Sequence, residues 1–138
     1  MARKNIGKIN ISKLADTVAE ELKDCAYVWN GAIREAQNQT AEEAAELLRR
    51  TSPKAPGGEY AQSWTWDFES KRDKYTTIVH ASAPHYRLTH LLEFGHKLVV
   101  WGNPTNKRTR AFEHIAPAEK FAEDAVVKNI VKAVDHAN

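Results

Sequence analysis

The chain has a single cysteine and no long apolar run. Cys25 has no second cysteine with which to form a disulfide within the chain, which fits a reducing compartment. No stretch approaches the roughly 20 apolar residues that cross a bilayer, so we expect no contact with a membrane. Residues 1–5 lead into no apolar signal segment, so we do not expect export.

Sequence signatures of enzymes and cofactor sites are also scarce. Gly57 and Gly58 belong to no phosphate-binding loop and predict only a turn. No Gly-x-Ser-x-Gly elbow surrounds Ser63 or Ser82, and no pattern sets a nucleophile beside a base. Cys25 falls in an apolar helical stripe, which favours a small core residue over a nucleophile. We therefore expect neither an enzyme nor a bound cofactor.

Charge is nearly balanced overall but unevenly distributed. The formal net charge of +2 argues against a strongly basic nucleic-acid binder. Residues 1–13 and 97–110 each carry four basic residues and no acid, whereas residues 14–50 carry eight acids and four bases. Such segregation allows a basic segment to contact an acidic helix of another copy, or DNA; solvated surfaces give the same pattern. The candidate interface or DNA-facing residues are Arg3, Lys4, Lys8, Lys97, Lys107, Arg108, Arg110 and the neighbouring Trp101.

Residues 12–50 carry the longest helical pattern. Apolar or small residues recur from Leu14 to Leu47 in steps of 4, 4 and 3, a period that keeps a stripe on one side of a nearly straight helix. Gly31, or a capping box formed by Thr40 and Glu43, could instead break the helix. An unbroken helix would be roughly 55–60 Å long, against about 35–40 Å for a compact chain of this size. We therefore expect the helix to project and to need a partner.

The rest of the sequence predicts an α+β fold. Alternating aromatic residues indicate a strand at residues 60–69, and β-branched residues indicate a second strand at 75–81 that pairs with it. Further strands are predicted at 98–101 and 111–115, on either side of a loop tip at 102–106. Pro117 suits the first turn of a C-terminal helix. We predict one domain, 1–138, with a basic arm 1–11, a long helix 12–50, a small antiparallel sheet within 60–115 that contains a short helix 86–94, and a C-terminal helix 116–135.

Residues 83–96 hold the densest pattern of the chain. Pro84 interrupts the preceding strand, and three leucines at helical spacing then share one face. Gly95 can end this short helix in a conformation that glycine adopts at low cost. Glu93 is expected to have a structural role, accepting hydrogen bonds from Thr89, Arg87 or His96.

Three segments resemble a known family. They are TSPKAPGGEYAQSWTW, HYRLTHLLEFGH and HIAPAEKFAEDA, and together they cover residues 51–125 in the family's order. This is similar to the tail-completion or head–tail joining proteins, minor tail components found at the neck of long-tailed double-stranded DNA bacteriophages. Residues 55–58 depart from the commonest pattern, in which a basic residue or threonine precedes one glycine. The motif positions are Leu88, Thr89, Leu91, Leu92, Glu93, Gly95, His96, His114 and Pro117.

The resemblance implies a non-enzymatic virion protein that forms a ring at the neck, through which the genome passes. The implied partners are further copies of the chain in a cyclic, six-fold ring, a head-side connector or stopper protein, and a tail terminator or tail tube protein. Contact with genomic DNA would be transient and non-specific. The implied location is the neck or tail of the virion, and the host cytoplasm during assembly.

Two other functions stay open from the residues alone. A small DNA-binding or regulatory domain would use the basic loop 97–110 and bind duplex DNA in a salt-sensitive manner. A metal-dependent hydrolase would need a cluster of histidines and a carboxylate within a short stretch, although no His-Glu-x-x-His motif is present. The residues available for that cluster are His85, His90, Glu93 and His96.

Overall fold

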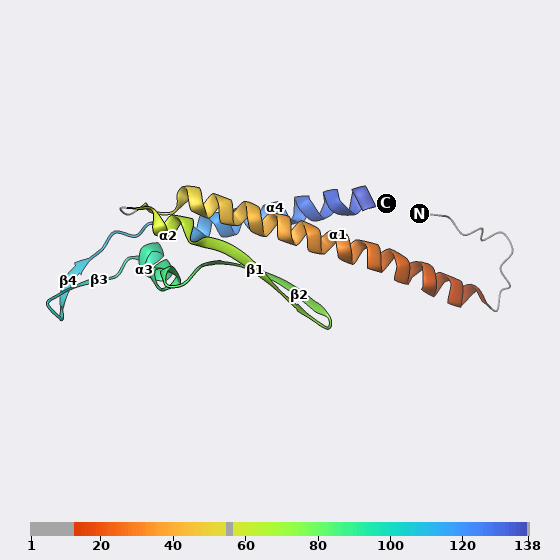
Figure 1. Cartoon of the computed structure of the whole chain (residues 1–138), viewed down its shortest axis with the longest axis horizontal. Coiled ribbons are helices and arrows are strands. Elements are labelled where there is room, and N and C mark those ends of the chain that lie inside the picture. Colours follow the sequence, from red (N-terminus) through yellow and green to blue (C-terminus); the bar gives the residue numbers. More distant parts are fainter. Residues whose placement is uncertain (1–12, 55–56, 138) are drawn as a thin grey trace.

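One continuous helix forms the long axis of the molecule (Figure 1). The computed structural model describes residues 13–54 and 57–137. Helix α1, Leu14–Thr51, has 38 residues and spans roughly 57 Å at 1.5 Å per residue. The alternative of a break at Gly31 or Thr40 is wrong, because the Thr40 hydroxyl donates to the Ala36 carbonyl at 2.8 Å and caps no new helix.

The two halves of α1 differ in burial. Its buried residues begin at Ala36 and are mostly alanines, which let a neighbouring backbone approach closely. Helix α4, Ile115–Ala137, runs back along this second half in the opposite direction (Figure 1). The Asn129 side chain on α4 donates to the Thr40 hydroxyl at 2.9 Å. Among residues 14–35, all of which are described, none is buried.

A β-hairpin also packs on the second half of α1. Strands β1, Trp64–Lys71, and β2, Lys74–Ala81, pair antiparallel. The Tyr75 hydroxyl donates to Asn38 at 2.8 Å, and the Arg49 guanidinium donates to the Trp64 carbonyl at 2.9 Å. These bonds fix the hairpin against the helix.

The prediction that the first strand begins at residue 60 is wrong. Residues Glu59–Gln62 instead form a short helix, α2, which follows Gly58 at φ 64°. The Ser63 hydroxyl and backbone N–H both donate to the Tyr60 carbonyl, at 2.6 and 3.1 Å, and close this turn. Tyr60 is thereby turned into the core.

The short helical stretch predicted at 86–94 is confirmed as a 3-10 helix, η2, His85–Leu88, followed by α3, Thr89–Phe94. Next comes a second antiparallel hairpin, β3, Lys97–Val100, and β4, Asn103–Arg108. The predicted strand at 111–115 and the loop tip at 102–106 are therefore wrong. The turn lies at Trp101 and Gly102, both with positive φ.

Residues 111–115 do not form a strand, because the backbone N–H groups of His114 and Ile115 bind Glu93 at the start of α4 instead. The two hairpins also form separate two-stranded sheets, and not one shared sheet. This second hairpin projects from the body of the molecule (Figure 1), so side chains are exposed along β3 and most of β4.

No helix in the described part of the chain is both long and apolar enough to cross a membrane.

A small core joins these elements at the C-terminal end of α1. The core residues come from α1, α2, the first hairpin and α4, with α3 packed at the edge. They are Leu48, Tyr60, Trp64, Ala81 and Ala118, contacted by Leu47, Val79, Leu92 and Ile115.

Candidate functional site

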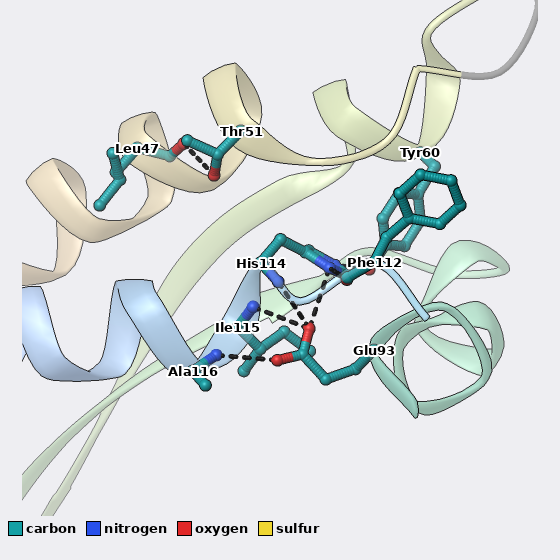
Figure 2. A network of polar contacts seen from close by, with 8 residues as sticks. All are labelled: Leu47, Thr51, Tyr60, Glu93, Phe112, His114, Ile115 and Ala116. Atoms are coloured by element: carbon teal, nitrogen blue, oxygen red, sulfur yellow. Dashed lines mark hydrogen bonds and ion pairs between the residues drawn. The ribbon is translucent and has the colours of Figure 1, made fainter. Parts of the chain in front are cut away.

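A buried carboxylate joins α3 to the N-terminus of α4. Glu93 is only 4% exposed. One of its oxygens accepts the backbone N–H groups of His114 and Ile115, at 2.8 and 2.9 Å, and the other accepts that of Ala116 at 2.9 Å (Figure 2). The first N–H groups of a helix have no partner within it and attract a negative charge. Glu93 therefore acts as the N-terminal cap of a helix that begins 22 residues later.

The charge of Glu93 is stabilised by these donors. Burial alone raises the pKa of a carboxyl group, since it disfavours the charged form. The three backbone N–H groups and the adjacent His114 outweigh burial, so the pKa of Glu93 lies below its ordinary value. Glu93 accepts hydrogen bonds, as predicted, but the predicted side-chain donors are wrong. Thr89 donates instead to the Tyr86 carbonyl, and the His96 ring contacts Thr109.

His114 links the same carboxylate to the aromatic core. Its ring Nδ1 lies 2.6 Å from the Phe112 carbonyl and 3.0 Å from the Glu93 carboxylate. Both are acceptors, so Nδ1 carries a hydrogen, while Nε2 forms a hydrogen bond with the Tyr60 hydroxyl at 2.8 Å. Burial, followed by the charge of Glu93, raises the pKa of Tyr60 to about 12. The rings of Tyr60, Trp64 and His114 meet edge to face, with centroids 5.7 to 6.1 Å apart.

Gly95 fixes the direction in which the chain leaves α3. Its φ is 70°, and a Cβ at this position would lie 2.6 Å from the Thr109 carbonyl oxygen. The next residue, His96, donates its backbone N–H to the Thr109 hydroxyl at 2.9 Å. The motif glycine therefore allows the base of the second hairpin to cross close behind α3.

The residues Glu93, Gly95, His96, His114 and Pro117 thus all lie at one junction, where α3 meets the second hairpin and α4. Pro117 lies in the first turn of α4, as predicted. Among the leucines of the motif, Leu92 packs on the core while Leu88 is 41% exposed. The backbone donors of Glu93 and the Tyr60–His114 bond were not predicted. The only sequence signal for these contacts is the run of polar and apolar residues just before Pro117, and the sequence alone does not show its meaning.

The four candidate metal ligands are not brought together. Glu93 is occupied by backbone donors, while His90 and His96 are exposed. Within residues 13–54 and 57–137, no group of three or more His, Cys, Asp or Glu side chains is placed to hold a metal ion. The geometry therefore lends the hydrolase alternative no support.

The first half of α1 presents an apolar stripe outside the core. Here we call Leu14, Val18, Leu22, Cys25 and Trp29 the α1 stripe; at 100° per residue they share one face. Leu22 is 65% exposed. This half of α1 extends past the end of α4 and past the tip of the first hairpin (Figure 1). The prediction of a projecting helix is confirmed.

The second hairpin presents a basic and apolar surface. We call residues 97–110 the basic hairpin. Along β3, Leu98, Val99 and Val100 are all exposed, and Trp101 at the turn is 96% exposed. Arg108 reaches back to the Gly95 carbonyl at 3.5 Å, and Arg110 lies over the Phe112 ring, whereas Lys97 and Lys107 are simply exposed. The other predicted basic residues, Arg3, Lys4 and Lys8, lie outside the described residues.

The α1 stripe and the basic hairpin lie at opposite ends of the elongated molecule (Figure 1). One molecule cannot bring them into contact with each other. Both surfaces leave large apolar side chains exposed.

Comparison with known proteins identifies a family for the chain. The family model described as "Bacteriophage HK97-gp10, putative tail-component" matches residues 8–95. No curated protein matches the chain, and no solved structure does. The match covers more than half of the chain, including α1, the first hairpin and the Glu93–Gly95 motif. The chain therefore belongs to the HK97 gp10-like family of bacteriophage tail components.

Proposed function

We propose that this tail component forms a ring at the phage neck, which joins the DNA-filled head to the tail and lets DNA pass. The observation that carries the proposal is the pair of exposed apolar surfaces at opposite ends of the molecule. Covering a large apolar side chain is worth about 1.5–3 kcal/mol, so the α1 stripe and Trp101 favour association strongly.

The position of these surfaces favours a ring over a symmetric pair. A contact between two different patches repeats from copy to copy, and it closes into a ring when the rotation per copy divides a full turn. We propose six copies, to match a tail tube, with a head-side connector on one face and a tail terminator or tube protein on the other. The same chain would be assembled in the host cytoplasm before it joins the particle.

The function excludes strong sequence recognition of DNA. A channel must let every sequence pass, so contacts would be to phosphates through Lys and Arg. We propose that basic side chains not used between copies, including those of residues 1–13, line the channel. The near-neutral total charge of +2 favours this transient contact over a DNA-binding regulatory role.

The proposal is tested by deleting the gene from its phage and examining the particles by electron microscopy. We expect DNA-filled heads and separate tails that fail to join, and joining restored when the chain is supplied in trans. Intact joined particles from the deletion phage would overturn the neck function. In wild-type particles, averaged images should place a ring of this chain between head and tail; density for it elsewhere would also contradict the proposal.

A further inference from the structure

We infer that the acidic first half of α1 in one copy docks on the basic hairpin of the next copy. This inference deepens the proposed function, on which it rests, by assigning the two surfaces that copies use to bind each other. Neither the family description nor the fold specifies such a contact. The argument depends on charge, on apolar surface and on the position of the two elements.

Charge makes the two surfaces complementary. Residues 14–31 contain four acids and one base, a formal charge of −3. The basic hairpin contains four bases and no acid, a formal charge of +4. Opposite charges on two surfaces accelerate their encounter and disfavour pairing of like with like. Two α1 helices of neighbouring copies would instead place acidic surface against acidic surface.

Apolar surface supplies the attraction once the two elements meet. At 100° per residue, Glu21 and Asp24 follow one edge of the α1 stripe, and Ala15, Ala19 and Ala26 follow the other. The small alanine side chains therefore let a hairpin lie flat over the stripe from their edge. Its lysines can then reach the acids at the opposite edge. On the hairpin, exposed Leu98, Val99 and Val100 alternate between the two faces of the strand, so either face adds aliphatic surface near the exposed Trp101 at the turn. An aromatic at such a tip is a typical anchor of an interface.

The outer face of α4 is a weaker candidate for the same role. It exposes Val127 and Val131, but these lie among Lys128, Lys132 and Asp135. These two bases and one acid give this face a formal charge of only +1, against +4 on the basic hairpin, so it complements the acidic half of α1 less well. Its position beside α1 is also at the middle of the molecule, whereas the basic hairpin lies at the far end (Figure 1).

The first experiment reverses charge on each surface and then on both. Lys97→Glu with Lys107→Glu should weaken self-association at least tenfold, measured by analytical ultracentrifugation and by the fraction of joined particles. Both lysines are exposed, so the monomer should keep its circular dichroism spectrum. Adding Glu21→Lys with Asp24→Lys should restore association. The matched control is Lys71→Glu with Lys74→Glu, which makes the same charge change at the tip of the first hairpin and should leave association unchanged.

Failure of the second pair of changes to restore association would overturn the inference. In that case, loss of salt-dependent binding to duplex DNA in the Lys97→Glu, Lys107→Glu variant would assign the basic hairpin to DNA. An equal loss in the first-hairpin control would show that total charge, and not the basic hairpin, governs association.

The second experiment uses Cys25, which already lies in the α1 stripe and is the only cysteine of the chain. We would add Val99→Cys and oxidise both purified protein and whole particles. Each copy then carries both cysteines, so the proposed contact gives a ladder of dimers, trimers and larger species on a non-reducing gel. Cys25→Ser should abolish the ladder. The matched control places the new cysteine at Ser70, on the first hairpin, and should give no ladder.

Other outcomes identify other contacts and overturn this one. Dimers alone, formed by wild type through Cys25, would indicate that two α1 helices pair. A disulfide within one chain between Cys25 and an introduced Lys8→Cys would show that the chain's own N-terminal segment covers the stripe. Particles that join normally but never give the ladder would overturn this contact while leaving the neck function intact, whereas joined particles without the chain would overturn the neck function itself.

Discussion

At the scale of single residues, Glu93 connects more of the structure than any neighbouring side chain. Its two oxygens accept three backbone N–H groups of α4, and it contacts His114, which in turn binds Tyr60. A carboxylate that accepts several charge-assisted hydrogen bonds is costly to remove, because the donors are left buried without partners. The motif Glu-Phe-Gly is thus a structural device, and neither a metal ligand nor a catalytic acid is needed to explain it.

Replacing Glu93 with Ala should destabilise the monomer by about 2–4 kcal/mol, since three buried or partly buried hydrogen bonds from backbone N–H groups lose their charged acceptor. Urea unfolding followed by circular dichroism measures the change, at one protein concentration for all variants. Glu113→Gln is the control, because Glu113 is exposed and its change should stay within about 0.5 kcal/mol. Equal stability of Glu93→Ala and wild type would contradict the capping role.

The pH dependence of stability should carry the signature of the same group. The pKa of Glu93 is lower in the folded chain than in the unfolded one. Its contribution is therefore fully present above the unfolded value of about 4.3 and is lost as pH falls through the folded value. The difference in unfolding free energy between wild type and Glu93→Gln should shrink over that acidic range. A difference that stays constant down to acid pH would show that Glu93 contributes only through its shape.

At the scale of elements, two glycines in helical surroundings have opposite roles. Gly31 lies in the exposed half of α1, and a Cβ there would meet nothing within 4 Å. Gly95 combines a φ of 70° with a Thr109 oxygen 2.6 Å from the position of a Cβ. Gly31 lowers the stability of α1 without determining its path, whereas the path of the chain after α3 requires a glycine at position 95.

Gly31→Ala should therefore raise the helicity of α1 and stabilise the chain by about 0.5–1 kcal/mol, while Gly95→Ala should destabilise it by more than about 2 kcal/mol. Helicity is measured by circular dichroism at low temperature, and stability by urea unfolding. If Gly31→Ala instead lowered stability, the glycine backbone would be needed in a contact between copies. This loss of stability would then appear only above the concentration at which copies associate.

The elements differ in how far the sequence predicts them. The steps of 4, 4 and 3 from Leu14 to Leu47 predict α1 because one face of the helix is apolar along its whole length, whether or not the chain itself covers it. Strand β4 was missed because Asn103–Arg108 is polar and exposed on both faces, and so lacks any alternation. The partners of Glu93 were missed because they lie more than 20 residues away, and only the fold brings them near.

At the scale of the whole molecule, burial separates residues that hold the monomer from residues available to other copies. Trp64 and Trp101 make the contrast clear: Trp64 is 4% exposed within the core, and Trp101 is 96% exposed at the turn of the basic hairpin. A small core at one end of α1 and exposed apolar surface at both extremities characterise this elongated molecule.

Trp101→Ala should leave the unfolding free energy of the monomer within about 0.5 kcal/mol of wild type but weaken self-association, because it removes the anchor of the basic hairpin. Trp64→Ala should cost about 3–5 kcal/mol through the cavity it creates. Denaturation measures the first quantity and sedimentation the second. Unchanged sedimentation of Trp101→Ala across the association range would remove the tryptophan from the interface.

The bond between Glu93 and the start of α4 also limits how the chain can be divided. The segment that matches the family model ends at residue 95, two residues after the carboxylate and well before all three of its donors. A fragment that ends at residue 95 would retain the Glu93 carboxylate without its three N–H donors. It would also expose the alanine-rich face of α1 on which α4 packs. The span matched by the family model is thus shorter than the span that the packing of this chain requires, which includes the remaining residues up to the end of α4.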